Sequence, residues 1–157
     1  MQILKQQYEL IKSSREVVLK YYEGMNPADL TKEIESFNKN SMLNMFLHIA
    51  NTYIFWLRRF AENEEIEYFK EENIPDISAL RKTFDEVNKT VDKFLNKHTN
   101  PGTPIEGEIF WLKKNMTYTV LELLTHVYTH EFHHKGQLMT MSRMLGHTPP
   151  DADVIRF

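Results

Sequence analysis

The strongest constraint on this chain is the spacing of its apolar residues, which recur every three or four positions in four separate segments. This period places the apolar side chains on one face of an α-helix, and each such face has to be buried against another element. The segments are residues 2–22, 41–61, 77–97 and 119–145. Since no strand pattern is strong, the spacing predicts an all-α fold, an antiparallel four-helix bundle in a single domain of residues 1–157.

The individual segments carry more detailed signals. The second is apolar over most of its circumference, as expected for a deeply buried helix. The fourth opens with a capping box, in which Thr119 precedes Glu122 by three positions, and Gly146 follows its end. The loop before it contains proline and glycine, and its last part, residues 109–112, is compatible with an extended segment or a short hairpin.

Composition narrows the function classes. The chain has no Cys, which excludes disulfides, thiolate metal sites, iron–sulfur clusters and a cysteine nucleophile. Charged residues interrupt Met1–Lys20, where a signal peptide would be apolar, and no apolar run approaches the roughly 18 residues of a membrane span. The net charge is −3, with Lys and Arg scattered rather than clustered. We therefore expect a cytoplasmic protein that binds neither nucleic acid nor membrane.

The histidines are the most informative polar residues. Seven are present, and four of them fall within nine positions of the fourth helix: His126, His130, His133 and His134. His130 and His134 lie four residues apart, on positions where the apolar stripe of that helix would continue. On a helix their Cβ atoms are about 5–6 Å apart, so both imidazoles can reach one metal ion. A third ligand then has to come from another helix.

His48 is the candidate for that third ligand, since it is the only histidine of the second, strongly apolar segment. Three neutral imidazoles leave at least one coordination position open, as in catalytic rather than structural sites. The sequence thus predicts a divalent metal held by His48, His130 and His134, with Zn, Ni, Cu and Fe all suited to such ligands. Three further side chains are predicted to line a cofactor pocket at this site: Asn44, Thr52 and His126.

Less specific interpretations compete with the metal site. A single buried histidine is usually a hydrogen-bonded core residue, and a pair four residues apart also occurs by chance on exposed faces. Two histidines on one apolar stripe are different, since each buried polar ring without a partner costs roughly 1–3 kcal/mol. His133 is expected on the helix surface, about 80° from the midpoint of the ligand pair. His98 and His147 lie near helix ends, where positive charge is favourable, and are not expected to be ligands.

Other catalytic motifs find little support. The chain has no glycine-rich phosphate loop and no G-x-S-x-G sequence. Glu131 directly follows His130, as the glutamate does in the H-E-x-x-H helix of metalloproteases. Those helices pack beneath a sheet, however, and no sheet is predicted here. Protease activity is therefore disfavoured.

Two segments together resemble the DinB family. One is the run from His126 to Leu138, followed by Met144-Leu145-Gly146 and Pro149-Pro150-Asp151, and the other is Ser41–Ala50, followed by Trp56-Leu57. The resemblance implies an up-down-down-up four-helix bundle, often a homodimer, with a metal held by His48, His130 and His134. One departure is Lys135, where the family usually has arginine; the charge is kept but the planar donor fork is lost.

The resemblance also suggests three functional hypotheses. Related bundles include enzymes that use the low-molecular-weight thiols mycothiol or bacillithiol, so the first hypothesis is a metal-dependent thiol S-transferase with a small-molecule substrate. The second is a metal-dependent hydrolase, for which the sequence names no general base, because Glu131 points about 100° away from His130. The third is a non-catalytic, stress-related interaction protein in which the metal only orders the helices. The catalytic residues and the thiol partner stay unassigned.

Overall fold

The computed structural model describes residues 1–156. Its long helices are α1 (Gln2–Glu23), α3 (Met42–Ile54), α4 (Ile77–Lys97) and α5 (Val120–Met144), and a π-helical segment, η2 (Phe55–Phe60), continues α3. The short elements are α2 (Pro27–Leu30) and two 3-10 turns, η1 (Glu35–Phe37) and η3 (Glu71–Asn73). Strands β1 (Pro104–Ile109) and β2 (Lys114–Thr119) pair antiparallel. The protein is thus mostly helical, with one small sheet.

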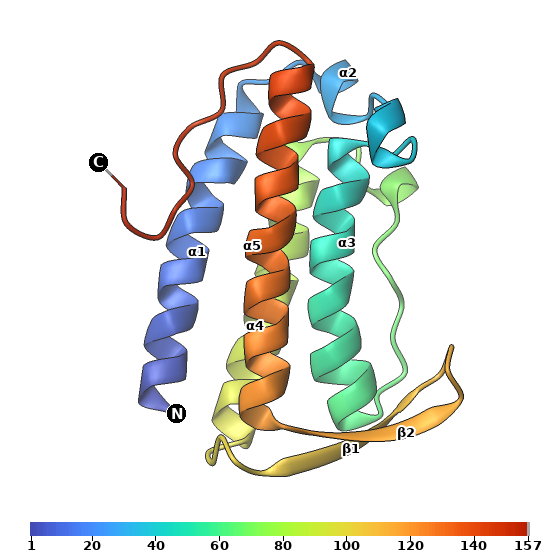
Figure 1. Cartoon of the computed structure of the whole chain (residues 1–157), viewed down its shortest axis with the longest axis vertical. Coiled ribbons are helices and arrows are strands. Elements are labelled where there is room, and N and C mark those ends of the chain that lie inside the picture. Colours follow the sequence, from blue (N-terminus) through green and yellow to red (C-terminus); the bar gives the residue numbers. More distant parts are fainter. Residues whose placement is uncertain (157) are drawn as a thin grey trace.

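The four long helices lie side by side, and the hairpin of β1 and β2 crosses one end of them (Figure 1). Helices α1 and α5 run in one direction and α3 and α4 in the other. Helix α3 packs against both α4 and α5, and α1 packs against the same two helices. Within residues 1–156, none of the helices has the length and apolar content that a bilayer crossing requires.

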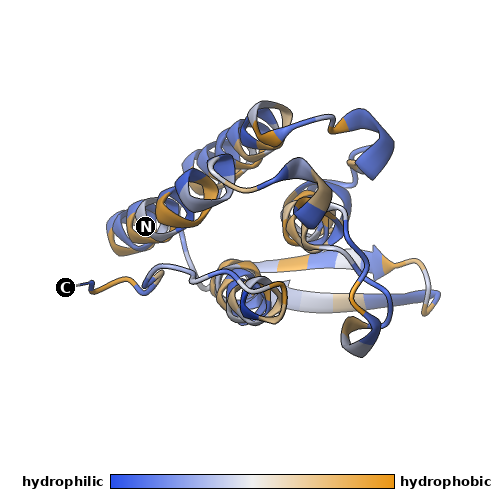
Figure 2. Cartoon of the chain, turned by 90° about the horizontal axis from the view of Figure 1, so that it is seen from above, coloured by the Kyte–Doolittle hydropathy of each residue, from blue (hydrophilic) through white to orange (hydrophobic). Residues whose placement is uncertain are grey.

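The core forms where the apolar faces of the long helices meet. Hydrophobic and hydrophilic residues are interspersed along every helix, as Figure 2 shows. Helix α3 buries residues on most of its sides, in agreement with its apolar sequence. Large side chains fill the centre, and these include Tyr8, Tyr22, Phe46, Tyr53 and Phe60. Edge-to-face contacts between such rings, for example between Tyr22 and Phe46, connect α1 to α3.

The helix bounds agree closely with those predicted from apolar spacing, and the capping box at Thr119 and Glu122 forms as expected. The prediction of an all-α fold is wrong in one respect, since residues 104–119 form a β-hairpin. The turn at 110–113 carries the residues for which either an extended segment or a hairpin had been expected. Strand β2 escaped prediction because its residues are almost all exposed, so that no apolar alternation marks it.

Candidate metal centre

The three predicted ligands come together where α3 and α5 lie side by side. The ring centroids of His48 and His130 are 4.8 Å apart, those of His48 and His134 are 4.6 Å apart, and those of His130 and His134 are 4.3 Å apart. His48 lies on α3, whereas His130 and His134 lie on successive turns of α5. The pair on α5 and the single residue on α3 thus form one cluster, hereafter the three-histidine cluster.

The donor geometry of the three-histidine cluster fits a metal ion. One ring nitrogen from each residue lies within 4.8 Å of the other two. The Nε2 atoms of His130 and His134 are 3.1 Å apart. Two nitrogens that each bind a tetrahedral metal at 2.0–2.1 Å are themselves about 3.3 Å apart. The cluster could therefore hold a divalent ion with only small side-chain movements.

The protonation state of the rings also suits metal binding. Burial, together with the smaller effect of the neighbouring rings of His134 and His48, lowers the pKa of His130 to about 3. Burial likewise lowers the pKa values of His48 and His134. All three imidazoles are therefore neutral at pH 7, and a neutral imidazole has the free lone pair that a metal requires.

The second nitrogens of the rings differ in their support. His134 Nδ1 lies 2.6 Å from Oε1 of Gln137, one turn along α5. A hydrogen bond of this kind fixes the tautomer, so that Nε2 of His134 is left for a metal. By contrast, Nδ1 of His130 is buried and has no hydrogen-bond partner. The protein therefore orients the ring of His134 through its second nitrogen, whereas the second nitrogen of His130 has no such support.

The three-histidine cluster lies at the surface of the helical core and not inside it. His48 is exposed, and His130 and His134 are half-buried. The prediction that both histidines of α5 continue its apolar stripe is therefore wrong. The buried face of α5 passes instead through Glu131 and Lys135, which are 1% and 3% exposed. A helix position one residue further along is rotated by about 100°, and that rotation moves the histidines to the edge of the buried face.

Glu131 belongs to a buried ionic network that links α1, α3 and α4 to α5. Arg15 donates from Nε to Oε1 of Glu131 at 2.9 Å and from Nη2 to Oε2 at 2.7 Å. Tyr53 donates to Oε2 at 2.7 Å, and Arg15 also donates to Asn88 at 2.8 Å. Burial alone would raise the pKa of Glu131, but the ion pair with Arg15 outweighs it and the pKa is lowered. We call Arg15, Tyr53, Asn88 and Glu131 the core ionic network.

The core ionic network determines where Glu131, the glutamate of the H-E-x-x-H pattern, points. Both carboxylate oxygens of Glu131 accept hydrogen bonds inside the core, so this group does not face the three-histidine cluster. The ammonium group of Lys135, next to His134 in sequence, also points inward and donates to Ser14 Oγ on α1. Burial lowers the pKa of Lys135 to about 8. The sequence holds a signal for both residues, since Glu131 and Lys135 are four residues apart and lie between the buried Val127 and Leu138.

The other predicted site residues lie on α3 and α5 beside the cluster. His126 lies one turn from His130, at 5.7 Å between ring centroids, and its pKa is lowered by burial. Asn44 is exposed on α3, and Thr52 donates from Oγ1 to the backbone oxygen of His48 at 2.8 Å. His133 is exposed, as expected. His98 and His147 lie outside the cluster and form hydrogen bonds through Nε2, with Glu62 at 2.7 Å and with Asp29 at 2.9 Å.

Sequence comparisons agree with this arrangement. The model of the DinB family matches residues 1–157. The uncharacterized protein YizA of Bacillus subtilis (strain 168) is 26% identical over 117 residues, which cover 73% of this chain and 71% of YizA. The family match spans both helices that carry the three-histidine cluster. On this basis, the chain belongs to the DinB family.

Proposed function

We propose that this protein is a DinB-type four-helix bundle of up-down-down-up topology that holds one divalent metal ion and activates a small thiol. The proposed ligands are His48, His130 and His134. The observation that carries the proposal is the meeting of three neutral imidazoles, with ligand atoms within 4.8 Å of one another, of which His48 is exposed. Three protein ligands at an accessible position leave room for a further ligand from solution, as catalytic metal sites require.

The chemistry follows from the donor set and from the composition. A divalent ion held by three neutral ligands would lower the pKa of a thiol that binds beside them, so that its thiolate forms near pH 7. The chain has no Cys, so the thiol has to come from a separate small molecule. The thiolate sulfur would form a bond to an electrophilic carbon of the substrate. The leaving group would depart with the bonding electron pair, and the thiol proton would pass to solvent.

Residues next to the three-histidine cluster are proposed to position the ligand rings and the thiol compound. Gln137 holds the ring of His134, and the exposed edge of His48 keeps one side of the cluster accessible. Asn44 and Thr52 flank His48 on the same helix face and are proposed to contact the thiol compound. Homodimer formation, which the family resemblance implies, stays a prediction.

The hydrolase hypothesis is less well supported. It needs a general base close to the open coordination position. Glu131, the carboxylate next to His130 in sequence, is engaged by Arg15 and Tyr53 in the core. A protein in which the metal only orders the helices is the remaining alternative, and loss of activity without loss of fold distinguishes the enzyme from it.

The test is a thiol-transfer assay on the metal-loaded protein. Protein reconstituted with Zn²⁺, Ni²⁺ or Fe²⁺ is mixed with bacillithiol, mycothiol, glutathione or coenzyme A, with 1-chloro-2,4-dinitrobenzene as the electrophile. We expect acceleration over free metal with at least one thiol. The acceleration should be lost in His130→Ala and kept in His133→Ala, which changes an exposed histidine of the same helix. Equal rates with protein and with free metal, across all thiols, would argue against the enzyme.

A further inference from the structure

A cavity lies between η2, β2 and the first turns of α5, at the hairpin end of the helices. It has a volume of about 300 Å³ and is lined by Trp56, Tyr118, Glu122, Leu123 and His126. This volume is at the lower end of the range for small-molecule sites, which are mostly apolar with a few polar groups. We call it the aromatic pocket.

Three rings form the walls of the aromatic pocket. Trp56, from the π-helical segment η2, meets His126 edge to face, with ring centroids 5.0 Å apart. It meets Tyr118 of β2 in the same way at 5.8 Å. Trp56 is only partly buried, so part of its ring surface is available to a ligand. Aromatic walls of this kind favour flat apolar groups, which gain both dispersion and edge-to-face contacts.

The aromatic pocket is continuous with the three-histidine cluster. His126 lines the pocket and its ring lies 5.7 Å from that of His130, between centroids. The two sites therefore adjoin one another on α5, and their nearest residues, His126 and His130, are one helical turn apart. A molecule bound at the histidines can extend along α5 toward the aromatic pocket.

The walls of the pocket are held in place by the hairpin. At Gly107 a Cβ atom would come within 2.3 Å of the backbone oxygen of Phe60, so β1 packs directly on the end of η2. Phe60 in turn contacts both Trp56 and Tyr118, with ring centroids at 5.1 and 5.6 Å. The pocket is thus largely formed before any ligand binds, which reduces the entropic cost of binding.

The charge at the rim restricts the ligand further. Glu122 is the one acidic residue among those that line the pocket. Its carboxylate accepts hydrogen bonds from the backbone and side chain of Thr119 in the capping box, which hold it at this position. An anionic ligand would meet a like charge here, whereas a neutral one would not.

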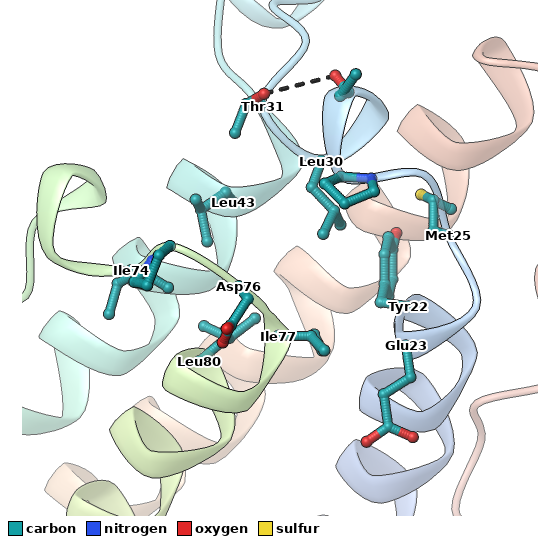
Figure 3. A pocket seen from close by; sticks show the side chains of 13 residues that line it. Tyr22, Glu23, Met25, Leu30, Thr31, Leu43, Ile74, Asp76, Ile77 and Leu80 are labelled. Atoms are coloured by element: carbon teal, nitrogen blue, oxygen red, sulfur yellow. Dashed lines mark hydrogen bonds between the residues drawn. The ribbon is translucent and has the colours of Figure 1, made fainter.

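A cavity of similar volume, about 320 Å³, lies at the opposite end of the helices (Figure 3). Its polar groups already have partners: Tyr22 donates to the Leu138 oxygen, Asp76 accepts from the amide of Ala79, and Glu23 pairs with Arg81. This cavity lies at the far end of the helices from the hairpin, whereas the aromatic pocket adjoins the three-histidine cluster through His126.

We propose that the aromatic pocket binds an uncharged aromatic or apolar part of the small molecule that reacts at the three-histidine cluster. The proposal rests on the proposed function for the identity of that neighbouring site. The proposed substrate class is a neutral molecule that carries an aromatic or similarly flat apolar group as well as its reactive atom.

The first experiment compares two probes of the metal-loaded protein at pH 8: imidazole and 4-phenylimidazole. Binding is followed through the visible absorption of Co²⁺. We expect 4-phenylimidazole to bind about tenfold more tightly, the effect of one aromatic contact. Trp56→Ala and, separately, Tyr118→Ala should remove this advantage while the affinity for imidazole is unchanged. Equal affinities of the two probes for the unmodified protein would overturn the proposal.

The second experiment needs no metal, so its failure is distinct from failure of the proposed function. The chain has two Trp, and Trp111 lies 57% exposed in the hairpin turn. In ¹⁵N-tryptophan-labelled protein, with Trp111→Phe used for assignment, benzyl alcohol should shift the indole signal of Trp56 saturably. The signal of Trp111 should not saturate in parallel, and benzoate should bind at least tenfold more weakly than benzyl alcohol. Failure of benzyl alcohol to shift the Trp56 signal, or equal binding of benzoate, would contradict the proposal.

Discussion

The two faces of α5 present opposite solutions to the burial of polar groups. On the core face, Glu131 is 1% exposed and both of its carboxylate oxygens accept hydrogen bonds from Arg15 or Tyr53. On the face toward the three-histidine cluster, one residue earlier, His130 has a buried Nδ1 without a hydrogen-bond partner and an Nε2 that lies 3.1 Å from Nε2 of His134. The same helix thus carries a fully paired charged network and a neutral cluster in which one buried ring nitrogen has no partner.

The difference separates residues that stabilise the fold from residues that bind a ligand. Buried charges persist in proteins only when they are paired, and removal of one partner is strongly destabilising. A hydrogen bond between two neutral rings, such as that between the Nε2 atoms of His130 and His134, contributes little to folding. Three imidazoles that meet at one point could instead offer their lone pairs to one metal ion. The core ionic network is therefore expected to stabilise the fold, and the three-histidine cluster is the candidate for metal binding.

The largest expected effect tests the core face. Glu131→Ala leaves the charge of Arg15 buried and unpaired, so it should lower the free energy of unfolding by roughly 3–5 kcal/mol. For a chain of this size, that corresponds to a fall in Tm of about 10 °C or more. Urea and thermal unfolding of the metal-free protein measure both quantities.

The matched control replaces both partners by apolar residues. In the double variant Arg15→Met with Glu131→Leu neither partner of the ion pair is left alone, so part of the lost stability should return, although the buried Lys135 still loses the attraction of Glu131. If Glu131→Ala has the same free energy of unfolding as the unmodified protein, the carboxylate contributes nothing to the fold, and the stabilising role given to the core ionic network is wrong.

An effect of intermediate size tests the three-histidine cluster. Gln137→Leu removes the acceptor that holds His134 Nδ1, so we expect metal affinity to fall about tenfold, with little change in stability. Competition with a chromogenic zinc chelator measures the affinity. Thr140→Val, on the exposed side of the same helix, is the control and should leave it unchanged. Wild-type affinity in Gln137→Leu would show that the ring of His134 is held by other contacts.

The smallest effect is the dependence of metal-free stability on pH. His130 has a pKa of about 3 in the folded chain and about 6.5 when unfolded, so the unfolded chain binds more protons between these values. Stability therefore falls as pH falls below about 6.5. The contribution of this half-buried ring, allowing for solvent screening, is about 1 kcal/mol between pH 7 and pH 5. His130→Ala should lose that much less stability in urea unfolding, and parallel curves for the two proteins would contradict the shift.

Much of the fold followed from sequence because the long helices depend on local signals. Apolar spacing and the capping box at Thr119 gave the bounds of α5 to within a residue. Strand β2 could not be predicted in this way, since its residues are mostly exposed and it pairs with β1, which is positioned by the packing of Gly107 on Phe60. A contact between residues so far apart leaves no periodic trace in the sequence.

The site was predictable in its members but not in its depth. The spacing of His130 and His134 and the lone histidine of the second segment correctly brought three rings together. The buried face of α5 was misassigned by one position, because charged residues were not expected in the core. Glu131 and Lys135 are buried only because Arg15 and Ser14 on α1 receive them. Partners on a different helix, more than 100 residues away in sequence, are not visible in the local pattern.

The most direct test of the central claim is the metal stoichiometry of the purified protein and its histidine variants, measured by elemental analysis after equilibration with Zn²⁺ and removal of free metal. The account predicts one equivalent of zinc in the unmodified protein and in His133→Ala. It predicts almost none in His48→Ala, His130→Ala and His134→Ala, with the fold of each variant verified by circular dichroism. One full equivalent in all three folded variants would contradict the assignment of these histidines as the metal ligands.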